Sequence, residues 1–114
     1  MSEPTVAETL QLTHGVPPAE FGHVVAALGR LDERLRSFPV GTVELHLGVK
    51  ERDTPSQRTT LEARIAGRPR IIATSSRRDF DAALAEVRDD LIRQITDAKN
   101  RTEPRNSRVR RQTL

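Results

Sequence analysis

Hydrophobic and polar residues follow two different periods along this chain, and the order of these periods predicts an α+β fold. Three segments, residues 6–12, 43–50 and 60–65, alternate apolar and polar residues, which is typical of strands with one buried face, and a fourth strand is expected over residues 71–74, after a short turn. Two further segments, residues 18–37 and 76–101, carry apolar residues three or four positions apart, the spacing of one helix face. The pattern predicts the order β-α-β-β-β-α, with a four-stranded sheet and two helices packed on one of its faces.

Local signals refine the ends of these elements. Pro18 suits the first position of a helix, and the first helix is expected to end near Ser37, before a proline. Ser76, followed three residues later by Asp79, predicts that Ser76 caps the second helix. The first strand is the least regular element, because Glu8 falls on its apolar side.

The length and composition predict one small domain. The chain has 114 residues, of which 35% are hydrophobic, so one compact core is the limit. We expect a single domain over residues 1–101 and a basic arm over residues 102–114 that is disordered without a partner. The absence of cysteine excludes disulfides and thiolate metal sites. With no long apolar run and no signal peptide pattern at the N-terminus, we expect a cytoplasmic protein.

Positive charge is concentrated in the second half of the chain. Residues 1–57 carry a net charge of −3 and residues 58–114 a net charge of +6. From Lys99 to the C-terminus the chain has six basic residues and one acidic residue, Glu103. A partly basic helix beside an arginine-rich arm suits a polyanion such as RNA. Arginine, which binds phosphate through two parallel hydrogen bonds, dominates the cations, although a genome rich in G and C would also explain this bias.

Residue patterns that support catalysis or metal binding are missing. His14, His23 and His46 do not have the spacing of metal ligands. No glycine-rich phosphate loop, nucleophile elbow or paired-carboxylate signature occurs. We therefore expect a protein that is not an enzyme, with no metal, cofactor or small-molecule substrate, and with His46 on the open face of the sheet.

A short motif in the second helical segment carries a family resemblance. Its first part is an aspartate, two residues, two alanines and an aliphatic residue, and its second part places a leucine, an arginine and a glutamine before a basic end. These positions are Asp79, Ala82, Ala83, Leu84, Leu91, Arg93, Gln94, Lys99 and Arg101. In this motif and in element order, residues 6–101 resemble the N-terminal domain of the ribosome hibernation-promoting factors. This family is also called the sigma-54 modulation or ribosome-associated inhibitor family.

The resemblance implies a fold similar to a double-stranded RNA-binding domain and a stress-related role in translation. Family members dock in the small ribosomal subunit where messenger and transfer RNA would sit, and they stop translation by exclusion. The chain departs from the family at Asp81, where tyrosine is common, and at Asp90, Asp97 and Ala98, where basic residues or histidine are common. Each lost cation weakens attraction to phosphate.

Ten basic residues are the candidate contacts to small-subunit ribosomal RNA. With the resemblance in hand, the principal candidates are Arg93, Lys99 and Arg101, the secondary ones are Arg30 and Arg34, and Arg88 is a further candidate. The arm, with Arg105, Arg108, Arg110 and Arg111, is expected to act as an electrostatic tether. The alternative for the helical cations is a solvated surface balanced by neighbouring aspartates, and for the arm a solubilising terminus. The alternative function is a protein-interaction module that uses the open sheet face or an edge strand. Binding of free duplex RNA and weak homodimerisation are further hypotheses.

Overall fold

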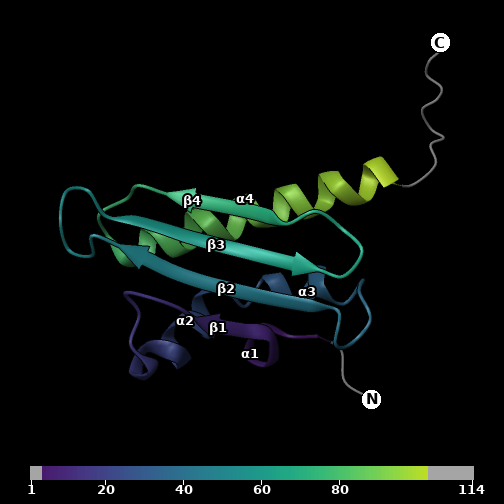
Figure 1. Ribbon diagram of the computed structural model, residues 1–114, viewed down its shortest axis with the longest axis horizontal. Helices are drawn as coiled ribbons and strands as arrows, with labels where there is room; N and C mark the ends of the chain where they lie inside the picture. Colours follow the sequence, from purple (N-terminus) through teal and green to yellow (C-terminus); the bar gives the residue numbers. More distant parts are fainter. Residues whose placement is uncertain (1–3, 103–114) are drawn as a thin grey trace, which may run out of the picture.

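The computed structural model describes residues 4–102, with side chains as far as Ala98. It has one four-stranded sheet whose strands are β1 (Leu10–Leu12), β2 (Val43–Lys50), β3 (Arg58–Ile65) and β4 (Ile71–Ser75). The helical elements are α1 (Val6–Thr9), η1 (Pro18–Glu20), α2 (Phe21–Ala27), α3 (Leu31–Leu35) and α4 (Phe80–Thr102). Figure 1 shows α4 crossing behind β3 and β4, with its C-terminal end projecting past the sheet. The predicted α+β fold, with helices packed on a four-stranded sheet, is confirmed.

The sheet is mixed, with the strands in the order β1-β2-β3-β4. β1 pairs parallel to β2, whereas β2, β3 and β4 form an antiparallel meander. In this register Leu47 pairs with Leu61, which in turn pairs with Ala73, so one face of the sheet is consistently apolar. The two edges of the sheet are the short strand β1 and the strand β4.

The core lies between this apolar face and the helices. Leu45, Leu61 and Ala63 of the sheet are fully buried, as are Leu84 and Leu91 of α4. Such burial stabilises the fold by about 1.5–3 kcal/mol for each large side chain relative to an exposed one. The helical side of the core is completed by Val24, Leu28, Leu31, Leu35, Phe38, Val87 and Ile95.

The N-terminal segment differs from the predicted strand. Val6–Thr9 forms a single helical turn, and the strand is confined to Leu10–Leu12. The Thr5 hydroxyl caps this turn by accepting from the Glu8 backbone N–H at 3.2 Å, and the Val6 N–H donates to Asp32 Oδ1 at 2.8 Å. The turn buries Val6 completely and leaves Glu8 exposed, whereas a strand would have placed both residues on its apolar side.

The first predicted helix is divided into three pieces. A 3-10 turn over Pro18–Glu20 leads into α2, and α3 follows after a break at residues 28–30. Gly29 lies in this break, where glycine lowers helix stability by about 1 kcal/mol relative to alanine. In this break the Leu31 N–H donates to the Leu28 carbonyl and the Asp32 N–H donates to the Gly29 carbonyl, each at 3.0 Å. These bonds change the direction of the chain, and Leu28 and Leu31 are both buried.

Helix α4 starts later than the sequence predicted. Asp79, and not Ser76, caps it, because Asp79 Oδ2 accepts from the Ala82 backbone N–H at 2.9 Å. A carboxylate at this position also complements the positive end of the helix dipole. Within residues 4–102, no helix is long and apolar enough to cross a membrane.

Candidate nucleic-acid interface

The packing of α3 against α4 brings three of the predicted cations together. Arg30 precedes α3, Arg34 lies within it, and Arg93 lies on α4, and all three line one shallow depression. The depression has a volume of about 270 Å³, and its remaining lining residues are Glu33, Asp89 and Ile92. Helices packed side by side on one face of a sheet therefore gather cations that lie about sixty residues apart in the sequence.

These three arginines differ in how they are neutralised. Arg30 and Arg34 are exposed, and neither forms an ion pair with any residue that the structure describes. Arg93 donates to the Asp90 carboxylate one turn earlier in α4. Exposed pairs of this kind contribute at most about 1 kcal/mol, so a phosphate could displace Asp90 at little cost.

Arg88 occupies a more enclosed position. Its side chain is only 18% exposed, its Nε donates to Asp89 at 2.8 Å, and its Nη1 donates to the Ala27 carbonyl at 3.2 Å. The hydrogen bond from Arg88, with Arg30 nearby, holds the pKa of the Asp89 carboxyl below its usual value. Arg88 thus joins α4 to the end of α2, and a contact with RNA would compete with these bonds.

The remaining candidates are the cations at the C-terminal end of the chain. The side chains of Lys99 and Arg101 lie outside the described part of the structure, although both belong to α4. The arm cations Arg105, Arg108, Arg110 and Arg111 also lie outside the described residues. Their contacts to RNA stay predictions.

The open face of the sheet carries charges of both signs. Glu62, with a side chain 16% exposed, accepts from Arg64 at 3.2 Å and from Arg70 at 3.1 Å. Partial burial opposes ionisation of Glu62, but the bonds from the two arginines outweigh it and lower its pKa. His46 lies on this face, as predicted, and bonds to Glu44 at 3.1 Å. This part of the open face is internally neutralised.

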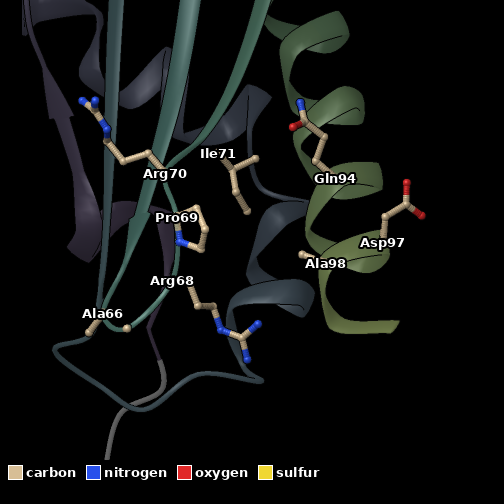
Figure 2. Close-up of a pocket in the computed structure, with 9 residues that line it drawn as sticks. Ala66, Arg68, Pro69, Arg70, Ile71, Gln94, Asp97 and Ala98 are labelled. Atoms are coloured by element: carbon tan, nitrogen blue, oxygen red, sulfur yellow. The ribbon is translucent and has the colours of Figure 1, made fainter. Parts of the chain in front are cut away.

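A wider groove opens at the end of the sheet where the β3–β4 turn approaches α4. Figure 2 shows Ile71 and Ala98 facing the space between β4 and α4, while Arg70 and Asp97 point away from it. Its volume is about 740 Å³. Gln94 of α4 donates to the Ile72 carbonyl at 2.9 Å and so occupies one hydrogen-bonding group of the edge strand. A peptide that added to β4 would have to displace it.

The opposite end of the domain holds a network that the sequence did not reveal. Arg52, in the β2–β3 hairpin loop, donates to both carboxylate oxygens of Glu20 at 2.6 and 2.8 Å and lies 4.1 Å over the ring of Phe80. The bond from Arg52 lowers the pKa of Glu20. Nearby, His23 of α2 bonds to Asp81 of α4 at 2.5 Å, and this bond raises the pKa of His23. These pairs fasten the hairpin loop, η1, α2 and the start of α4 to one another.

Clusters suited to a metal ion are not found among the described residues. No three histidine, aspartate or glutamate side chains in that part of the chain meet in such an arrangement. His23 forms an ion pair with Asp81, and His46 forms one with Glu44.

Together, these elements define the class of protein: an α+β domain whose mixed four-stranded sheet carries its helices on one face. Among solved structures, the N-terminal domain of Protein Y from Thermus thermophilus has this fold, with a TM-score of 0.55. The two sequences are 18% identical, and the match covers 79% of this chain and 98% of that domain. No family model and no curated protein matches the sequence.

Proposed function

We propose that this protein is a ribosome-associated translation inhibitor, a hibernation factor that binds small-subunit ribosomal RNA at the decoding channel. The observation that carries this proposal is the convergence of Arg30, Arg34 and Arg93 on one surface formed by α3 and α4. The motif resemblance and the fold shared with the Protein Y N-terminal domain support the same role. Inhibition would result from occupation of the channel and would need no chemical step.

The proposed contact is to the RNA backbone and not to base edges. Arginine forks match phosphate oxygens, whereas the stacking aromatic residues that read single-stranded bases are scarce in a chain with three phenylalanines and no tryptophan or tyrosine. Glu33, Asp89 and Asp90 beside the arginines reduce the local positive charge. The arm, which carries Arg105, Arg108, Arg110 and Arg111, would add attraction as a tether. We expect moderate affinity that depends steeply on salt.

Co-sedimentation with small ribosomal subunits across a salt titration tests this proposal. Each phosphate contact adds about 0.7–0.9 to the slope of log affinity against log salt, so replacing Arg30 and Arg34 by glutamine should lower the slope by about 1.5. The matched control replaces Arg64 and Arg70 by glutamine, which removes the same charge from cations already paired with Glu62. The control should bind nearly as well as the wild type. Absence of binding at low salt, or equal losses in both variants, would contradict the proposal.

The second candidate function is a protein-interaction module on the sheet. Ile72 favours it, because this large apolar residue is 48% exposed on the open face at the edge strand β4. Such a module predicts a salt-insensitive partner whose binding is lost when Ile72 is replaced by lysine. Replacement of Arg30 and Arg34 would leave that binding unchanged, so the same variants separate the two functions.

A further inference from the structure

One pair of like charges stands directly opposite across two strands of the open face. Lys50 ends β2, Arg58 begins β3, and the two residues are register partners. Side chains opposite each other in an antiparallel pair have Cβ atoms only about 5 Å apart, and like charges there are destabilising. Both side chains are exposed, and neither forms an ion pair with a described residue.

The surroundings of this pair differ from the rest of the open face. Towards the other end of the same strands, Arg64 and Arg70 share the carboxylate of Glu62. The open-face positions next to Lys50 and Arg58 are Gly48 and Thr60, which are register partners of each other and carry no charge. The acids of the hairpin loop are Glu51 and Asp53, and the structure gives neither of them an ion pair with Lys50 or Arg58.

The backbone beneath the pair is held firmly in place. Gln57, adjacent to Arg58, is 2% exposed, and its Oε1 accepts from the Asp53 N–H at 2.8 Å. Its Nε2 donates to the carbonyls of Arg77 and Arg78 at 3.0 and 3.1 Å. The hairpin is therefore tied to the loop before α4, and the two cations project from a fixed ladder. Cations whose backbone is fixed lose less entropy when they bind an anion.

We propose that Lys50 and Arg58 form a second phosphate-binding surface for RNA, on the face of the sheet opposite the helices. A phosphate between the two cations would relieve their repulsion. RNA binding would therefore explain a like-charge pair that does not stabilise the fold. This inference rests on the proposed function for its ligand, RNA, but not for its location. With the arginines of α3 and α4 on the other face, the domain would then contact RNA on both sides, as suits a protein that lies in a channel.

The test compares two double variants that remove equal charge from the same face. One replaces Lys50 and Arg58 by glutamine, and the control replaces Arg64 and Arg70 by glutamine. Each full-length variant is titrated with two probes, purified small ribosomal subunits and a naked RNA duplex, at low and at physiological salt. Two lost phosphate contacts should weaken binding about tenfold at low salt in the first variant and leave the control close to the wild type. The first variant should also melt at the same or a higher temperature than the wild type, because a like-charge pair has been removed.

The outcomes separate this inference from the proposed function. Unchanged binding of the Lys50/Arg58 variant, or an equal loss in the control, overturns the inference. Binding of the duplex that depends on Lys50 and Arg58, without any binding of small subunits, supports the inference and contradicts the proposed function. A lower melting temperature in the Lys50/Arg58 variant would assign the pair a structural role and overturn the inference. Failure of the wild type to bind either probe overturns both.

Discussion

Asp81 stands where the family that the sequence resembles commonly has tyrosine, and here it forms a bond within the fold. In this chain its carboxylate accepts from the His23 ring, so it joins the first turn of α4 to α2. The negative charge of Asp81 also lies near the positive end of the α4 dipole. Asp81 therefore stabilises the packing of α4 against α2.

The bond between His23 and Asp81 predicts a pH-dependent stability. The bond raises the pKa of His23 above its ordinary value of 6.5. Its contribution to the free energy of unfolding is therefore complete below about pH 6.5 and is lost as the pH rises through the raised pKa. Thermal unfolding of His23→Gln should therefore show a larger loss of stability at about pH 5.5 than at about pH 8.5. His14→Gln, which removes an exposed histidine that forms no ion pair with a described residue, is the control. Equal losses at both pH values for His23→Gln would contradict the assignment.

The contacts between segments that are distant in the sequence could not be predicted from the sequence. Arg88 bonds to the carbonyl of Ala27, 61 positions away, and Arg52 bonds to Glu20, 32 positions away. Periodicity reports which face of an element is buried, but it does not identify the partner of a polar side chain. Arg88 therefore looked in the sequence like any other cation on the solvent side of a helix.

At the scale of elements, the structure shows which of two candidate residues caps the start of α4. Ser76 and Asp79 both favour helix N-caps, but only Asp79 bonds to the backbone at the helix start. Replacing Asp79 by alanine should lower the free energy of unfolding by about 1 kcal/mol. Ser76→Ala should change it by less than about 0.5 kcal/mol, because Ser76 is exposed outside the helix. Urea denaturation measures both, and a greater loss for Ser76→Ala would contradict the assigned cap.

Elements with a regular pattern were predicted well, and those decided by tertiary contacts were not. β2 alternates cleanly over Val43–Lys50, and its bounds match the prediction. β3 starts two residues earlier than expected because Arg58 and Thr59 continue the ladder opposite Lys50 and Val49. The helical turn of α1 depends on the bond between the Val6 N–H and Asp32, which no local pattern reports.

The motif that carries the family resemblance describes folding more than binding. Asp79 caps α4, Leu84 and Leu91 are fully buried, and Gln94 bonds to the edge strand β4. Among its described positions, only Arg93 presents a cation at the surface depression. The motif thus contributes mainly to the fold, and the case for RNA binding depends on Arg93 together with Arg30 and Arg34, which lie outside the motif.

At the scale of the whole molecule, the fold distributes cations over both faces and leaves a subset without carboxylate partners. Arg30 and Arg34 lie on the helical face, and Lys50 and Arg58 lie on the sheet face. Most other described arginines are paired, including Arg52, Arg64, Arg70, Arg77, Arg88 and Arg93. Attraction to RNA would therefore come from the unpaired cations, from Arg93 once phosphate displaces Asp90, and from the arm, and not from the total charge of the chain.

Electron cryomicroscopy of small ribosomal subunits incubated with this protein tests the central claim most directly. The account predicts density for one domain in the decoding channel, with Arg30, Arg34 and Arg93 against the ribosomal RNA backbone. Messenger and transfer RNA would be absent from the same particles, because occupation of the channel excludes them. Density elsewhere on the subunit, or particles that hold both the domain and transfer RNA in the decoding channel, would contradict it.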